Sequence, residues 1–405
     1  MKILFLAQRF PYPPNKGDKL RSFNQIKHLS LSHDISLVCL SDTETDLSLA
    51  EEMNRYCRSV DVIFHSRGKS RINSLMGLFS TKPLTLSHFR SRKLETVVNR
   101  KLEEEQFDLV FVYCSSMAQY VEHVRHCPVI IDFVDVDSEK WRQYSRFSKF
   151  PMSLVYRLES KRLRTYERSL SEKFRHCFFV SEKEAEDFRT FAAPSASIDS
   201  LPNGVDGKTF TPSNDPYDRN SVVFTGAMDY FANVEAVLYF VDQIMPIILT
   251  RVPQLRFHIV GSNPDKEICR LPEKYSNISV TGRVDSVRPY VVNSSVFVAP
   301  MRIARGVQNK ILEAMAMGVP VVSTSLGFEG INAIPGRDIF VEDTPEAFAN
   351  QVVQLMTDPR LRLRTAQYAR NVVDTFYDWQ ANLSKLDTLL STVEGSGAAA
   401  DPEAA

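Results

Sequence analysis

Residues Ser295–Ser325 read SVFVAPMRIARGVQNKILEAMAMGVPVVSTS, and this stretch decides the expected fold. Its pattern predicts a buried strand over 295–300, a loop over 301–306, a helix over about 307–317 and a second strand from Val319. Gly318 follows the last predicted helical residue and Pro320 comes shortly after it, which is a usual signal for a helix end. A strand, a helix and a strand in this order form one βαβ unit of a parallel sheet.

The same alternation extends over most of the 405 residues, a length that favours two domains. It is interrupted by SLPNGVDGKTFTP at 200–212, which is rich in turn-forming residues. We therefore predict an α/β protein with two Rossmann-like parallel-sheet domains, over 1–205 and 206–375. A C-terminal helix over 376–393 is expected to return towards the first domain. The tail over 394–405 has few apolar residues and is expected to be disordered.

Composition excludes several classes of protein. Lysine plus arginine and aspartate plus glutamate are balanced at 49 each, which argues against a dedicated nucleic-acid binder. The six cysteines form no Cys-x-x-Cys pair, and most lie in apolar stretches, so we expect reduced core thiols in a cytoplasmic protein. No run approaches the ~18 apolar residues of a membrane helix, and the apolar run after Lys2 is too short for a signal peptide.

Lys310 and Glu313 are the most informative polar pair in the quoted stretch. They are three residues apart and share one face of the predicted helix. That helix begins at the carboxyl end of a strand, where unpaired N–H groups and the positive end of the helix dipole suit a phosphate. A lysine there suits a diphosphate, and a carboxylate one turn deeper suits a ribose diol. A solvated ion pair without a ligand would show the same spacing.

The segment GVQNKILEAMAMGVPVVST resembles the nucleotide-sugar segment of the family 4 retaining glycosyltransferases, which have the GT-B fold. The resemblance implies two Rossmann-like domains that face each other across a cleft, with the donor bound by the second. The family motif has two glutamates separated by seven residues, and Glu313 matches the second. The first should stand at position 305, where this chain has Arg305. The resemblance therefore leaves the contacts to the donor sugar open.

The resemblance also names a donor site by position. PNGVD at 202–206 is similar to the interdomain segment, and FTGAMDYFANVEAVLYF, with Gly226, to the opening of the second domain. The family often has an arginine and a lysine after that glycine, where this chain has Met228 and Asn233 or their neighbours. The nearest cations by sequence are Arg302, Arg305 and Lys310. The predicted catalytic residues are Arg305, Lys310 and Glu313, and the predicted donor-binding residues are Gly17, Gly226, Arg302, Gly306, Val307, Lys310 and Glu313.

On the acceptor side, Gly17 in PPNKGDKLRS stands where the family has a glycine-rich loop after strand one. Ser115 follows the predicted strand FDLVFVY, and Asp135 follows PVIIDF, so we predict both as acceptor contacts. A helix-capping role for Asp135 remains an alternative. Three aspartates at alternating positions, Asp132, Asp135 and Asp137, would not all face one site in an extended segment, so no metal is expected there. The resemblance likewise implies a fold that works without a metal or a cofactor.

Two stretches of the first half are basic. Residues 67–101 hold nine lysines and arginines against one acidic residue, and residues 140–175 hold eleven against three, with aromatic residues interleaved. Such a surface suits an anionic membrane leaflet that carries a lipid-linked acceptor. A solvated face of a soluble enzyme is the alternative. A peripheral position on the inner face of the cytoplasmic membrane is therefore expected.

Together with PPNKGDKLRS and IDFVDVDSEKW, the chain resembles a subgroup that serves exopolysaccharide loci, including those associated with exosortase (PEP-CTERM) sorting systems. The resemblance implies transfer of a hexosyl group from a nucleotide-diphosphate sugar to a lipid-linked or growing polysaccharide, with retention at the donor carbon. A sugar-nucleotide epimerase of the same fold is one alternative. A non-catalytic nucleotide-sugar-binding subunit is another, because Arg305 replaces a sugar-contacting glutamate.

Overall fold

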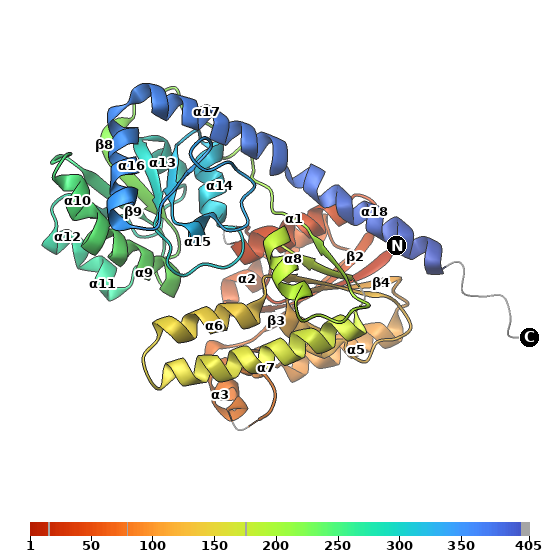
Figure 1. Ribbon diagram of the computed structural model, residues 1–405. Helices are drawn as coiled ribbons and strands as arrows, with labels where there is room; N and C mark the ends of the chain where they lie inside the picture. The colour runs from red at the N-terminus through yellow and green to blue at the C-terminus, as the bar shows by residue number, and fades with distance from the viewer. Residues whose placement is uncertain (15–16, 79, 175, 398–405) are drawn as a thin grey trace, which may run out of the picture. The chain divides into compact units, whose positions relative to one another are not determined.

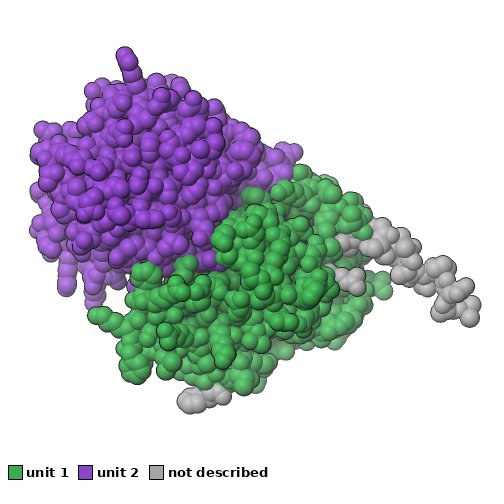
Figure 2. Space-filling view, viewed as in Figure 1, with its two compact units in different colours: residues 1–202, 383–405 green, residues 203–382 purple. Residues whose placement is uncertain are grey.

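The computed structural model describes residues 1–14, 17–78, 80–174 and 176–397. Two compact units divide the chain. Unit 1 contains Met1–Pro202 and Leu383–Ala405, and unit 2 contains Asn203–Asn382 (Figure 2). The C-terminal helix α18 (Trp379–Gly397) thus begins in unit 2 and continues as part of unit 1 (Figure 1).

Unit 1 is built on a seven-stranded sheet in the order β3-β2-β1-β4-β5-β6-β7, and every pair of neighbours is parallel. In β1, five consecutive residues are buried, because a parallel sheet covered by helices on both faces needs apolar side chains on both. The strands are β1 (Lys2–Ala7), β2 (Asp34–Ser41), β3 (Ser59–Phe64), β4 (Leu109–Tyr113), β5 (Val129–Val134), β6 (His176–Phe179) and β7 (Ser197–Ser200).

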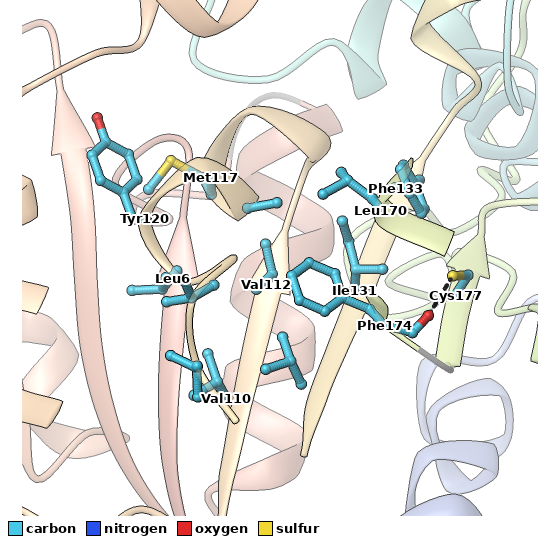
Figure 3. Close-up of a cluster of buried hydrophobic side chains, with 14 of the residues drawn as sticks. Leu6, Val110, Val112, Met117, Tyr120, Ile131, Phe133, Leu170, Phe174 and Cys177 are labelled. Carbon is cyan, nitrogen blue, oxygen red and sulfur yellow. Dashed lines mark hydrogen bonds between the residues drawn. The ribbon is translucent and has the colours of Figure 1, made fainter. Parts of the chain in front are cut away.

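The helices of unit 1 cover this sheet. The core between sheet and helices contains β4 and β5 side chains packed against η2, α7 and the start of β6 (Figure 3). The helices are α1 (Gly17–Leu29), α2 (Glu44–Ser48), η1 (Ala50–Arg55), α3 (Arg67–Gly77), α4 (Leu84–His88), α5 (Arg92–Glu104), η2 (Ser115–Tyr120), α6 (Asp137–Phe147), α7 (Met152–Lys173) and α8 (Glu182–Arg189).

Unit 2 repeats the plan with six parallel strands in the order β10-β9-β8-β11-β12-β13. The strands are β8 (Asp218–Thr225), β9 (Arg256–Val260), β10 (Ile278–Val280), β11 (Ser294–Ala299), β12 (Val321–Ser323) and β13 (Phe340–Val341). The helices are α9 (Phe231–Tyr239), a π-helical turn η3 (Phe240–Ile244), α10 (Met245–Leu249), α11 (Lys266–Cys269), α12 (Leu271–Lys274), α13 (Arg288–Val292), α14 (Asn309–Ala316), α15 (Ser325–Phe328), α16 (Pro345–Thr357) and α17 (Pro359–Phe376).

Local signals set several helix ends as expected. Gly318, with φ at 68°, follows α14, and a left-handed residue at this position favours glycine. Thr344 and Asp358 cap α16 and α17 through their side chains, each just before a proline at the start of the helix. The short strands β7 and β13 were not predicted, because four and two residues carry too little periodicity.

The C-terminal helix is longer than predicted. It continues through residues 394–397, which the sequence places in a disordered tail; residues 398–405 lie outside the described part of the chain. Leu383, Leu386 and Leu390 are buried, and His28 Nε2 lies 3.0 Å from an oxygen of Asp387 in the same unit. The apolar i, i+3, i+7 stripe therefore orders the helix on unit 1, as the predicted return towards the first domain requires.

One segment, Phe231–Leu249, is long and apolar enough by composition to cross a membrane. Half of its apolar window is buried inside unit 2, where the Phe240 ring of η3 lies 4.6 Å from the Phe257 ring of β9. Core helices of soluble proteins pass the same test, so the segment is weak evidence for a membrane span.

Candidate functional site

The strand order of unit 2 reverses between β8 and β11. Ligands of open parallel sheets bind outside the carboxyl ends of the strands at such a switch point. β8 ends just before Gly226, and β11 ends just before the loop that leads into α14. The residues that follow these two strands are therefore the first candidates for a site.

Glycine is required where the ends of β8 and β9 approach each other. A Cβ on Gly261 would lie 1.6 Å from the carbonyl oxygen of Gly226. A Cβ on Gly226 would lie 2.6 Å from Asn233 Nδ2 and 3.2 Å from Lys310 Nζ. The absence of these side chains lets the backbone of Gly226 line the same space as the Lys310 ammonium group.

Lys310 occupies the centre of this arrangement. Its Nζ donates a hydrogen bond of 2.5 Å to Asn233 Oδ1 and lies 4.4 Å from the centroid of the Phe224 ring. Burial lowers the pKa of Lys310 to about 7, although the nearby Glu313 opposes that shift. The protein therefore supplies little negative charge to compensate the Lys310 ammonium, which suits this group to an anionic ligand.

Glu313 lies one turn further along α14 and is partly buried. Burial raises the pKa of its carboxyl to about 7, and the attraction of Lys310 works against the shift. Among the described residues its carboxylate has no hydrogen-bond or ion-pair partner. A carboxylate in this position can accept two hydrogen bonds from a ligand, as the predicted ribose contact requires.

The two predicted arginines of the loop are each held by a glutamate. Arg302 Nε donates to Glu235 Oε1 at 2.7 Å, and its guanidinium lies 4.2 Å from the centroid of the Tyr239 ring. Arg305 is largely buried, and its Nη1 lies 3.4 Å from Glu329 Oε1. Sequence spacing indicated neither partner, because both glutamates belong to other segments of unit 2.

The loop before α14 brings the remaining predicted residues to the same edge of the sheet. Gly306 is buried and has φ at 63°, a left-handed conformation that favours glycine. Val307 is half-buried and packs against the core cluster that includes Ile311 and Leu312. The helix itself begins at Asn309, two residues later than predicted. Direct contacts of Gly306 and Val307 with a donor stay predictions.

Asn233 is a residue whose role sequence reasoning missed. The sequence marks this position only because the family often has a lysine there. In the structure its amide oxygen accepts from Lys310, and its Nδ2 donates to Ala227 O at 2.9 Å. Met228 is buried in the core. A lysine at 233 would place a second positive charge next to Lys310, whereas the amide oxygen of Asn233 accepts a hydrogen bond from it.

In unit 1 the order reverses between β1 and β4, and polar residues follow both strands. Gln8 Nε2 donates to Ser116 Oγ at 2.9 Å, and Ser115 Oγ donates to Asp137 Oδ2 at 3.4 Å. Cys114 and Val134 end neighbouring strands with φ at 73° and 69°. Such conformations are unfavourable for residues with a Cβ, above all for a β-branched one, and they concentrate at functional sites.

Asp132 and Asp135, which lie three residues apart, have different surroundings. Asp132 is fully buried: its two carboxylate oxygens accept from Arg21 Nε at 2.8 Å and Nη2 at 3.1 Å. Gln25 also donates to it. Asp132 is therefore a structural residue that holds α1 on the sheet. Asp135 is partly buried beyond the end of β5, and its acceptor contact stays a prediction.

The structure adds a pocket in unit 1 that the sequence did not predict. It opens at the carboxyl ends of β1, β2 and β3 and is closed by α3 and α4; its lining is Gln8, Arg9, Leu40, Ser41, Asp42, His65, Ser70, His88 and Phe89. Burial, together with electrostatic interactions with His65 and Arg9, lowers the pKa of His88. The one sequence signal was the position of these polar residues directly after predicted strands.

Gly17 is exposed and is the first residue of α1. The predicted glycine-rich loop also includes Asn15 and Lys16, which lie outside the described residues. Lys19 Nζ pairs with Asp46 at 2.9 Å within unit 1. Contact of Gly17 with a donor therefore stays a prediction.

Within the described ranges, no three histidine, cysteine, aspartate or glutamate side chains are placed to hold a metal ion.

Residues 219–358, which lie within unit 2, match the family described as Glycosyl transferases group 1. Over these residues unit 2 is similar to group 1 glycosyltransferases. A Klebsiella pneumoniae protein described as "Uncharacterized 44.6 kDa protein in cps region" is 21% identical over 373 residues, covering 87% of this chain and 90% of its own. A GDP-mannose-dependent phosphatidylinositol monomannoside mannosyltransferase of Corynebacterium glutamicum is 24% identical over 53% of this chain and 61% of its own.

Solved structures support the fold over nearly the whole chain. Sucrose-phosphate synthase from Thermosynechococcus elongatus has a TM-score of 0.75 at 16% identity, covering 98% of this chain and 100% of its own. Anabaena Alr3699/HepE in complex with UDP-glucose has a TM-score of 0.69 at 14% identity, covering 97% and 100%. These neighbours are GT-B glycosyltransferases. The predicted fold class, with two parallel-sheet Rossmann-like domains, is therefore confirmed.

Proposed function

We propose that this glycosyltransferase moves a hexosyl group from a nucleotide-diphosphate sugar to a lipid-linked or growing polysaccharide acceptor, with retention of anomeric configuration. The observation that carries the proposal is the arrangement of Gly226, Asn233, Lys310 and Glu313 at the switch point of unit 2. Lys310 has no bonded carboxylate among the described residues and faces backbone at the start of α14. Glu313 lies one turn deeper on that helix, and its carboxylate has no hydrogen-bond partner in the same described ranges. This combination suits a diphosphate next to a ribose.

Charge develops on the diphosphate as the sugar bond breaks. Lys310 is suited to stabilise that charge, because its own charge has no carboxylate bonded to it within the described residues. In a retaining, same-face reaction the departing phosphate can accept the proton of the acceptor hydroxyl. Unit 1 then needs only to orient the acceptor, and serine hydroxyls such as that of Ser115 suffice for this. No metal is part of the proposal.

The acceptor site is proposed to include the pocket at the ends of β1–β3. Its volume of about 50 Å³ is smaller than a sugar ring, so we propose that it receives only a hydroxyl group of the acceptor, next to Gln8 and Asp42. The cps-region description of the Klebsiella relative supports a role in polysaccharide biosynthesis. The relatives' names point to different nucleotides, GDP in one and UDP in another, and both belong in the test.

The test incubates the full chain with UDP- and GDP-sugars, with and without a membrane extract that carries lipid-linked saccharides, and measures nucleotide release and the sugar product. Nucleotide release that requires the extract supports the transferase. An epimerised sugar nucleotide would instead assign the epimerase, and thermal stabilisation by a nucleotide without turnover would assign the non-catalytic subunit. A chelator should leave the transferase rate unchanged. Lys310→Met is the matched inactive control.

A further inference from the structure

Helix α3 of unit 1 exposes its apolar face and buries its polar face. Ile72, Leu75 and Met76 share one helix face and are 60%, 64% and 69% exposed. The opposite face is polar or small: Ser70 is buried, and Gly77 lies so close to α4 that a Cβ on it would be 2.7 Å from Ser87 Oγ. Surface helices normally bury their apolar side, so the exposed apolar face of α3 indicates an interaction surface.

The inner face of α3 is fixed by specific polar contacts. Ser74 Oγ donates to Ser70 O at 2.9 Å and lies 3.1 Å from His88 Nδ1 on the adjoining α4. At the end of the helix, Arg162 of α7 donates to Gly77 O at 3.1 Å and to Leu78 O at 3.3 Å. A rotation of α3 that would bury its apolar residues would break these bonds, so the outward orientation is built into the fold.

A second group of exposed apolar residues lies on the helix hairpin next to α3, at the turn from α6 to α7 (Figure 1). Phe150 is 82% exposed and Leu154 is 61% exposed. Leu158 follows Leu154 by one turn on the same face of α7, and Arg162, the residue that holds the end of α3, follows by one more. We call these two groups of exposed side chains, α3 residues 72, 75 and 76 and hairpin residues 150, 154 and 158, the apolar ridge.

The charges next to the apolar ridge are almost all positive. Residues 138–165 contain eight lysines and arginines but only two acidic residues, Glu139 and Glu159. Glu159 is buried and accepts from Leu84 N and Thr85 N at the start of α4, and Glu139 is paired with Arg142 and Arg164. Arg146, Lys149, Arg157 and Lys161 are exposed, and none has an ion-pair partner among the described residues.

We propose that unit 1 docks on an anionic lipid leaflet through the apolar ridge, with these four cations next to the headgroups. Lipid is favoured over a protein partner because exposed apolar residues occur together with exposed cations, while the two glutamates of the same segment already have partners within unit 1. This combination matches the chemistry of an anionic bilayer interface. The inference deepens the proposed function by naming the surface that would bring the enzyme to a lipid-linked acceptor. It also sharpens the sequence expectation, because Arg162 and Arg164 serve contacts within unit 1 rather than the membrane.

The experiment is co-sedimentation of the full chain with phosphatidylcholine vesicles, with and without phosphatidylglycerol, at low and high salt and without nucleotide sugar. Ile72→Ser with Met76→Ser and, separately, Phe150→Ser with Leu154→Ser should each lower partition about tenfold or more. The matched control is Ile334→Ser with Leu363→Ser, because these apolar residues of unit 2 are 51% and 58% exposed. The control should partition as the wild type does.

The charge arm uses Arg157→Gln with Lys161→Gln, one turn apart on α7. Partition on anionic vesicles should fall about tenfold or more at low salt, and the difference should shrink at high salt. Arg360→Gln with Arg364→Gln on α17, also one turn apart and exposed, should change nothing. Selective loss for the ridge and α7 variants supports the proposal.

Three results would overturn it: a wild type that does not sediment with anionic vesicles at low salt, ridge variants that sediment as the wild type does, or a dimer in light scattering that the ridge variants dissociate. The last result would assign the ridge to a second copy of the chain. Nucleotide release with a detergent-solubilised acceptor is measured in parallel. Intact transfer without vesicle binding would reject the docking surface alone, and vesicle binding without transfer would reject the proposed function alone.

Discussion

Each unit carries a pair of charged residues near the carboxyl edge of its sheet; the pair in unit 1 is fully buried and the pair in unit 2 is partly buried. The two pairs also differ in their hydrogen-bond partners. In unit 1, Arg21 and Asp132 share two hydrogen bonds, Gln25 adds a third, and Arg21 Nη1 reaches Leu201 O at 2.6 Å. In unit 2, Lys310 has an amide rather than a carboxylate as its bonded partner, and the charge of Glu313 reaches it only through space.

We interpret the first as a structural pair and the second as the binding pair of the proposed donor site. A buried charge is tolerated when its geometry is complete, and then removing one partner strands the other. Lys310 and Glu313 instead have pKa values displaced towards neutrality in opposite directions, which is the mark of charges that a ligand can still satisfy. The comparison predicts stability defects in unit 1 and binding defects in unit 2.

The largest effect is expected from Asp132→Asn. The substitution leaves the Arg21 guanidinium buried without its carboxylate, so the free energy of unfolding in urea should fall by about 3–5 kcal/mol. Glu172→Gln, which removes an exposed partner of Arg168 in the same unit, should cost at most about 1 kcal/mol. The double variant Arg21→Met/Asp132→Leu should recover much of the loss. Equal, small effects for the two single substitutions would contradict the structural role of Asp132.

Glu313→Ala should show the reverse pattern. The loss of hydrogen bonds to a charged acceptor should weaken nucleotide affinity by about 1.5–3 kcal/mol, or roughly 10- to 150-fold, in calorimetry with UDP and GDP. Stability should not fall by a similar amount, because the carboxylate is costly to bury when the site is empty. Glu346→Ala, at an exposed position of the same unit, is the control. Normal nucleotide affinity in Glu313→Ala would refute the donor-site assignment.

These two pairs also show what a sequence can and cannot predict. The strands, the long helices and the Lys310–Glu313 spacing follow from local periodicity, so most of the fold and the shared helix face of Lys310 and Glu313 could be predicted. That these two residues bind a donor stays a prediction. Partners distant in sequence could not: nothing near Arg302 or Arg305 indicates Glu235 or Glu329. Arg157 and Arg162 also cannot be told apart by sequence, because both lie in one basic stretch. The structure shows that Arg157 is exposed and that Arg162 holds the end of α3.

A smaller effect is expected at Arg305, which is proposed to stabilise charge on the leaving diphosphate. Arg305→Ala should lower turnover about tenfold and weaken binding of the bare nucleotide less, because the charge builds up in the transition state. Arg305→Glu should be worse, since a carboxylate would then face Glu329 and the phosphates. Glu329→Gln tests whether turnover depends on the Arg305 guanidinium or on its ion pair with Glu329. It leaves the guanidinium in place and should keep most of the turnover. Full activity of Arg305→Glu would remove Arg305 from the site.

The smallest expected effect is the uptake of about one proton when nucleotide binds. In the empty site the pKa of Lys310 is about 7, lowered by burial, so at pH 8 most of the lysine is neutral. A bound diphosphate favours the ammonium form and raises that pKa, so nucleotide binding at pH 8 should take up close to one proton. The same displacement makes the empty protein gain stability as pH rises from about 7 towards 10.5, because the unfolded lysine then holds more protons than the folded one.

Calorimetry in buffers with different ionisation enthalpies measures the uptake directly. Lys310→Met should abolish it while Glu313→Gln should leave most of it, because a glutamate with its pKa near 7 is already ionised at pH 8. Asn233→Asp should lessen the uptake, since a carboxylate bonded to Nζ keeps the lysine protonated before the nucleotide arrives. An uptake near zero in the wild type at pH 8 would mean that Lys310 is already a satisfied cation. The contrast between the two pairs would then be lost, and the diphosphate would need another cation in unit 2.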